Sequence, residues 1–140
     1  AVMNALKMWS GPENVPGLVA YLEWTLEGKP FPQSEGDAIA ILAKLKDPAA
    51  APVLAKFLPN GFHRGGAANA LKAIGPPAEK AVFPMLEHKD GWTVREACFV
   101  LKEIGTKESI EPLKKLIDKK PDFLVAPPAN EALQAVSKRN

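Results

Sequence analysis

The chain has few of the residues that build covalent or metal-linked sites. Of its 140 residues, one is cysteine (Cys98) and two are histidines (His63 and His88). A single cysteine excludes an intramolecular disulfide and a Cys-rich zinc site, and two histidines leave few ligands for any other metal. We therefore expect neither a metal nor a cofactor.

The chain also lacks a long apolar run, a strong net charge and many strand-forming residues. No stretch approaches the length of a membrane span, so we expect no membrane insertion. The net charge of +2 is too small to indicate a nucleic-acid or membrane partner by itself. Only three threonines occur, whereas alanine, leucine and lysine dominate, and this composition favours helix over sheet.

An internal repeat emerges when the apolar positions are aligned. Five of them, which we call anchors, end the first helix of each repeat and are separated by 36, 29, 30 and 32 residues. A leucine precedes every anchor by three positions and a valine or alanine by seven, which is the spacing of one helical face. The anchors are Trp9, Leu45, Ile74, Ile104 and Val136.

A second helix follows each of the first four anchors. Large apolar residues recur nine and twelve positions past the anchor, as Leu113 and Leu116 do after Ile104. A proline near the start of such a helix, such as Pro16, suits a first turn, where no backbone N–H is required. Pro84 would instead lie inside the third of these helices, and we expect it to kink that helix.

The residues between the helices have predictable places as well. Gly75 and Gly105 follow their anchors, where glycine can take the left-handed conformation that ends a helix. Phe62, Trp92 and Leu124 each lie twelve residues before an anchor. We expect these three large side chains to fill the junctions between stacked repeats.

Two helices in about 30 residues, repeated along the chain, predict a solenoid. We predict an all-α fold, a right-handed α-α superhelix of about four to five helix pairs without β-sheet. The single domain 1–140 would divide into a partial repeat 1–30, repeats 31–61, 62–91 and 92–122, and a terminal helix 127–138, with a loop around 28–32. Because the first residues resemble the middle of an amphipathic helix, we expect the chain to be a piece of a longer protein.

The fourth repeat carries the most specific pattern: Val94-Arg95-Glu96-Ala97, then Leu101, Ile104-Gly105 and Pro112-Leu113. It resembles the HEAT repeat, and in particular the short bacterial form also seen in phycobilisome lyases. The resemblance implies that the B helices, the second helix of each repeat, line a concave binding face. It also implies that Arg95 forms a polar ladder with an acidic residue of the preceding loop, for which Asp90 is the candidate.

Residues capable of catalysis show no catalytic spacing. We expect Cys98 to be a buried core thiol, and His63 and His88 to lie at surface or helix-capping positions. The carboxylates, Glu79 among them, are dispersed over successive helices, so we expect solvated positions instead of acid–base pairs. We predict no catalytic residue.

The residues that packing does not explain lie eleven to fifteen positions past an anchor, on one strip of the B helices. They mix acidic, basic and apolar groups, which suits a protein surface better than a polyanion. We predict a non-catalytic protein-binding or scaffold module that uses this face, without a nucleic-acid partner. The alternative, by resemblance, is an enzyme on the same solenoid, either a bilin lyase or a DNA-base glycosylase. The candidate contact residues are Glu23, Trp24, Lys56, Met85, His88 and Lys115.

Overall fold

The computed structural model describes residues 11–28 and 34–140. Within these ranges the chain consists of α-helices and short 3-10 helices, with no strand in either range. The all-α prediction is confirmed. The α-helices are α2 (Val15–Leu26), α3 (Glu35–Leu45), α4 (Ala51–Lys56), α5 (Arg64–Ile74), α6 (Glu79–Val82), α7 (Gly91–Ile104), α8 (Ile110–Asp118) and α9 (Ala126–Arg139). The 3-10 helices are η1 (Pro12–Asn14), η2 (Pro48–Ala50), η3 (Pro76–Ala78), η4 (Phe83–Glu87) and η5 (Lys107–Ser109).

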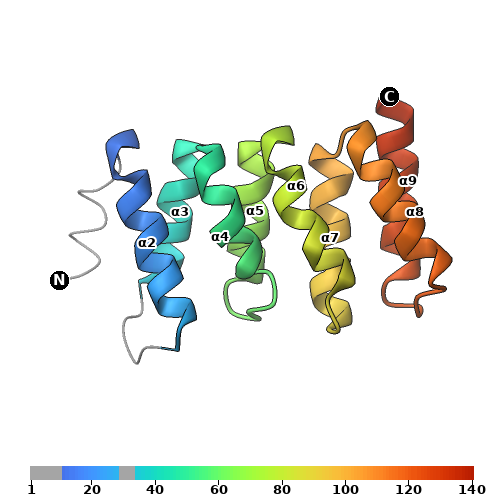
Figure 1. Cartoon of the computed structure of the whole chain (residues 1–140), viewed down its shortest axis with the longest axis horizontal. Helices are drawn as coiled ribbons and strands as arrows, with labels where there is room; N and C mark the ends of the chain where they lie inside the picture. The colour runs from blue at the N-terminus through green and yellow to red at the C-terminus, as the bar shows by residue number, and fades with distance from the viewer. Residues whose placement is uncertain (1–10, 29–33) are drawn as a thin grey trace.

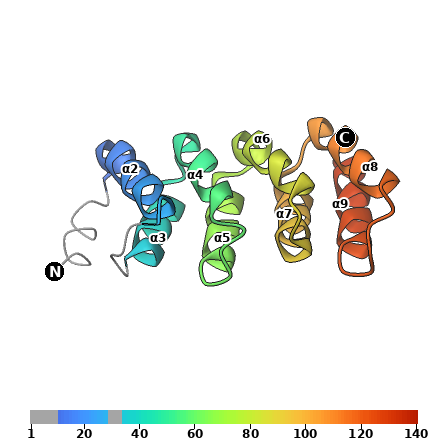
Figure 2. The same ribbon diagram turned by 60° about the horizontal axis from the view of Figure 1, so that its bottom comes forward.

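The helices stand in two layers along the long axis of the molecule (Figures 1 and 2). Helices α3, α5, α7 and α9 form one layer, which we call the A layer. Helices α2, α4, α6 with η4, and α8 form the other, which we call the B layer. Each A helix packs on the next A helix along the chain. This row of stacked helix pairs is an α-solenoid.

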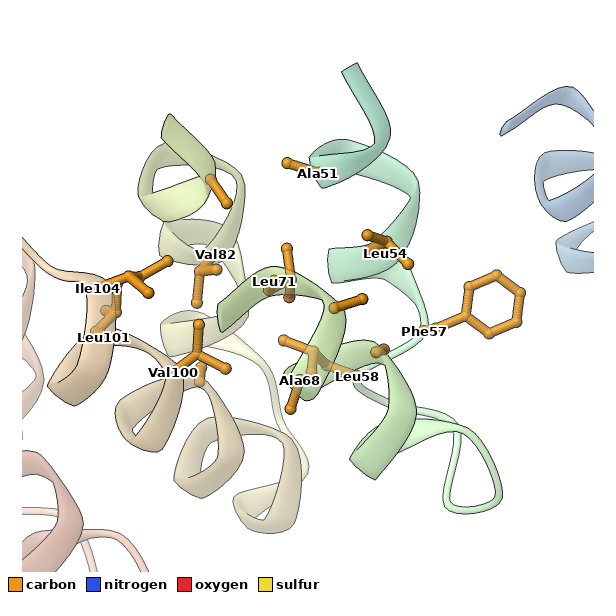
Figure 3. Packing of buried hydrophobic residues seen from close by; sticks show 14 of the residues in the cluster. Ala51, Leu54, Phe57, Leu58, Ala68, Leu71, Val82, Val100, Leu101 and Ile104 are labelled. Atoms are coloured by element: carbon orange, nitrogen blue, oxygen red, sulfur yellow. The ribbon is translucent and has the colours of Figure 1, made fainter. Parts of the chain in front are cut away.

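The core lies between the two layers and follows the sequence repeat. In each A helix the alanine seven positions before the anchor has no exposed surface, and the leucine four residues later is equally buried in α3, α5 and α7. In Figure 3, Leu71 of α5 lies between Leu54 of α4 and Val82 of α6. The alanine methyl lets neighbouring helices approach closely, and each buried leucine contributes roughly 1.5–3 kcal/mol. The alanines are Ala38, Ala67, Ala97 and Ala129, and the leucines are Leu42, Leu71 and Leu101.

Glycine plays two different roles at the ends of the A helices. Gly75 ends α5 with a φ of 87°, in the left-handed region that the sequence predicts. Gly105 ends α7 with a φ of −63°, so the left-handed prediction is wrong there. A Cβ at Gly105 would lie 2.6 Å from the Leu101 carbonyl oxygen and 2.8 Å from Cγ2 of Val136. Gly105 is therefore needed for the close approach of α9.

Pro84 interrupts the third B helix as the sequence predicts. The α-helical segment α6 ends at Val82, and the chain continues as the 3-10 helix η4 with Pro84 as its second residue. Proline has no backbone N–H to donate within the helix, and its ring clashes with the preceding turn of an α-helix. The B layer consequently presents a narrower, more tightly wound segment at this point.

The predicted junction residues divide into one that packs and two that do not. Leu124 is half-buried against the core, as expected. Phe62 is 97% exposed and Trp92 is 54% exposed, so both junction assignments are wrong. At the first junction the ring of His63 turns inward and meets the Phe57 ring edge-on, with the ring centroids 5.9 Å apart. In α7 the neighbours of Trp92 on its C-terminal side face the core, which turns the indole outward.

Some sequence predictions fall on residues outside the described ranges. These are the anchor Trp9 with its preceding helix, and most of the loop around 28–32.

Candidate functional site

A groove of about 390 Å³ lies between η4 and α8 in the B layer. Phe83 and Leu86 of η4 and Leu116 of α8 give it an apolar lining, to which Pro84 and Pro112 also contribute. Leu86 and Leu116 are also core residues, so the lining is anchored in the packed interior. A hollow of this size and composition can hold an apolar side chain of a partner.

The charged residues around this groove are mostly basic. Lys80 of α6, Lys115 of α8 and Lys119, which directly follows α8, contribute three ammonium groups, against the single carboxylate of Glu87. Lys80 lies 3.4 Å from the exposed carboxylate of Glu108, measured from Nζ to Oε2. Such an exposed pair contributes little to stability. The rim therefore favours a partner that carries carboxylates.

A second hollow of about 300 Å³ continues the groove toward the α8–α9 connection. It shares Leu86, Glu87, Leu116 and Lys119 with the first hollow, and His88 contributes to its wall. We call the two hollows together the B groove. The Nδ1 atom of His88 accepts a hydrogen bond of 3.0 Å from the backbone N–H of Asp90. This bond orients the imidazole.

Three of the predicted contact residues lie in, or directly after, the helices that form the B groove. His88 and Lys115 line it. Met85 lies in η4, but it is half-buried and packs against the core. Two candidates from different repeats are thus brought into one site.

The other three predicted contact residues lie elsewhere in the B layer. Lys56 is exposed at the end of α4, and Glu23 is exposed on α2. Trp24 is 41% exposed, and its ring lies 6.4 Å from that of Tyr21, between centroids. All three lie in the same layer as the B groove without lining either of its hollows.

The sequence placed Glu79 on a solvated face, and this was wrong. Glu79 is 4% exposed, and its carboxylate accepts three hydrogen bonds from the following repeat. The donors are the Ser109 hydroxyl (2.6 Å), the Thr106 hydroxyl (2.6 Å) and the Thr106 backbone N–H (2.8 Å). Burial acts to raise the pKa of Glu79, but these hydrogen bonds outweigh it and hold the pKa below its ordinary value.

The ladder predicted between Arg95 and Asp90 is also wrong. Asp90 pairs with Arg64 of the preceding A helix, with 3.1 Å between Nη2 and Oδ2. Asp90 also accepts hydrogen bonds from the Thr93 hydroxyl (2.7 Å) and backbone N–H (3.2 Å) at the start of α7. The Thr93 hydroxyl contributes most to the lowered pKa of Asp90, against the smaller opposing effect of burial. The sequence feature that could have predicted this pair is Arg64, which lies in the third repeat one position before the place that Arg95 has in the fourth.

The single thiol is structural, as predicted. Cys98 has no exposed surface, and burial raises its pKa to about 12, so the reactive thiolate is not accessible. In the described part of the chain, no group of three or more His, Cys, Asp and Glu residues is placed to hold a metal ion. None of the helices described is long and apolar enough to cross a membrane.

The stacked helix pairs, the recurring buried alanines and leucines of the A helices and the groove between B helices define an α-solenoid repeat protein. A family model described as HEAT repeats matches residues 59–134, which is more than half of the chain. The chain belongs to the HEAT repeat family, whose members are commonly protein-interaction scaffolds. No curated protein and no solved structure matches it significantly.

Proposed function

We propose that the chain is a protein-binding module and that the B groove receives a partner surface in which carboxylates surround an apolar side chain. The observation that carries this proposal is the groove itself, with Phe83, Leu86 and Leu116 flanked by Lys80, Lys115 and Lys119. An apolar anchor in a pocket with a charged rim is the usual anatomy of a protein interface. His88 and the exposed B-layer residues Lys56, Glu23 and Trp24 would extend the contact.

The surface lysines at the rim would act mainly on the rate of association. Their side chains are exposed, so each ion pair would form in water and add modest affinity. Charge complementarity would instead raise the association rate and reject basic partners. The apolar lining would supply most of the affinity, because it is the part that loses water on binding.

A paired charge reversal tests the proposal. We expect Lys115→Glu with Lys119→Glu to abolish binding of a subset of proteins captured from the cells of origin, measured by quantitative mass spectrometry. The matched control reverses two exposed lysines on A helices, Lys44→Glu with Lys138→Glu, and changes the net charge equally. Both variants should keep the fold, because exposed substitutions usually change stability by no more than about 0.5 kcal/mol.

Identical losses with the two variants would contradict the proposal, because they would show a response to net charge alone. A tetrapyrrole that copurifies with the chain would instead favour the bilin-lyase alternative. Release of a DNA base by the purified chain would favour the glycosylase alternative.

A further inference from the structure

A third hollow, of about 600 Å³, lies in the A layer between α7 and the start of α9. Trp92, Arg95 and Phe99 line it from α7, Phe123 lines it from the segment that leads into α9, and Pro127 lines it from the first turn of α9. We call it the A-layer hollow. It shares one lining residue, Asp122, with the B groove, but none of the five residues just named lines that groove.

The A-layer hollow exposes unusually large apolar side chains. Trp92 is 54% exposed and Phe123 is 90% exposed. The sequence assigned Trp92 to a junction between repeats, yet its side chain does not pack inside. Trp and Arg are the side chains most enriched among the residues that dominate binding energy at protein interfaces.

Arg95 lies in the middle of this aromatic surface. Its guanidinium carbon is 5.4 Å from the centroid of the Trp92 ring and 5.3 Å from that of the Phe99 ring. These distances are within the range of cation–π attraction, which holds the group without using its N–H donors. A guanidinium fixed in this way can donate two parallel hydrogen bonds to a carboxylate.

The nearby carboxylates already have other partners. Asp90 pairs with Arg64 at 3.1 Å, and Glu131 pairs with Lys102 at 3.2 Å. Asp122, at the edge of the hollow, accepts a hydrogen bond of 3.0 Å from the backbone N–H of Leu124. Among the described residues, Arg95 forms no hydrogen bond or ion pair. Asp122 and Glu131 line the hollow as well, but neither forms an ion pair with Arg95, so the guanidinium keeps its hydrogen-bond donors for a carboxylate of a partner.

We propose that the A-layer hollow binds an extended peptide segment of another protein in which an Asp or Glu side chain follows an aromatic or aliphatic residue. The carboxylate would pair with Arg95, and the apolar side chain would lie between Trp92 and Phe123. Because the hollow is open to solvent, side chains from the middle of a peptide can reach it, so the acidic residue need not be at a chain end. The residues that would contact the peptide, Arg95, Trp92 and Phe123, do not line the B groove.

Selection from a displayed library of random 12-residue peptides tests this proposal on the whole chain. Peptides should be enriched that place an acid beside an aromatic or aliphatic residue. A selected peptide, synthesised with blocked ends, should shift the indole N–H resonance of Trp92 in NMR spectra. That resonance is identified with the Trp92→Phe variant.

A double-mutant cycle then measures the Arg95 contact by fluorescence polarisation. Arg95→Gln, or replacement of the peptide acid by its amide, should each weaken binding about tenfold or more, as expected for a hydrogen bond to a charged group. The two changes together should cost little more than either one. The control Lys115→Glu with Lys119→Glu should leave peptide affinity unchanged, which separates this site from the B groove. Thermal melts would show that each variant remains folded.

Several outcomes would overturn the proposal: a selection that enriches nothing, enriched peptides without an acid, or affinities that do not respond to Arg95→Gln. Dimerisation of the free chain that depends on Arg95, measured by sedimentation, would assign the A-layer hollow to a second copy and would equally overturn it.

Discussion

Buried polar side chains link the repeats at the residue scale. The Glu79 carboxylate at the start of the third B helix accepts hydrogen bonds from Thr106 and Ser109 at the start of the fourth. Arg64 and Asp90 link the corresponding A helices. An apolar core alone tolerates sliding of one helix pair on the next, whereas such directional bonds fix the relative position of the repeats.

The Glu79→Gln substitution tests this link. Glutamine keeps the size of the side chain but replaces one acceptor oxygen by an amide donor, which would face the Ser109 or Thr106 donor. We expect a loss of about 1–3 kcal/mol in the free energy of unfolding, the usual cost of an unsatisfied buried group. Urea titration would measure this loss, with the exposed Glu108→Gln as a control. Equal effects of the two substitutions would contradict the role of Glu79.

The same carboxylate predicts a pH dependence. The pKa of Glu79 is lowered in the folded chain, so the unfolded chain binds its proton first as the pH falls. Its stabilising contribution is therefore complete above the ordinary value of 4.5 and is lost as the pH falls below that value through the folded pKa. The difference in stability between the native chain and Glu79→Gln should shrink over this acidic range. A constant difference would show that the charge of Glu79 is not involved.

At the element scale, helix ends decide how closely neighbouring helices approach. Gly105 ends α7 where a side chain would collide with Val136 of α9. Arg139 in the last turn of α9 donates hydrogen bonds to the carbonyls of Lys102 (2.6 Å) and Gly105 (2.9 Å). The end of α7 is thus packed and capped by α9, which accounts for the absence of any left-handed residue there.

Two glycine-to-alanine substitutions should have opposite effects. Gly105→Ala should destabilise the chain by about 1–3 kcal/mol, because the added methyl group meets three atoms within 2.8 Å. Gly65→Ala should stabilise it by about 0.4–1 kcal/mol, since Gly65 lies in α5 with no atom within 4 Å of an added Cβ. Thermal unfolding monitored by circular dichroism would measure both. Stabilisation by Gly105→Ala would contradict the packing of α7 on α9.

For the whole molecule, the fold could be predicted because the same apolar pattern recurs in successive repeats. The alanine and leucine columns face the core in successive helices, and Pro84 interrupts its helix where the sequence places it. Periodicity reports which face is buried, and repetition along the chain strengthens that signal.

The partners of individual polar side chains could not be predicted in the same way. Arg95 lies in α7, whose core face was correctly identified, whereas the burial of Glu79 in α6 was not predicted. Their contacts depend on which residue of the next repeat lies opposite. Arg64 lies one position earlier in its repeat than Arg95 does, and it is Arg64 that pairs with Asp90. The B groove likewise depends on how far η4 and α8 are apart, which periodicity does not report. His88 and Lys115 were found because they remained after packing had explained their neighbours.

Site-specific photo-crosslinking tests the binding role of the B groove most directly. A benzophenone side chain would replace Lys115 in the B groove or Lys44 in the A layer, and the chain would be irradiated in its cells of origin. We predict that position 115 forms a protein adduct that position 44 does not. The partner peptide recovered from that adduct should carry an acidic residue near an apolar one. Adducts at position 44 alone, or an adduct to nucleic acid at position 115, would contradict the account.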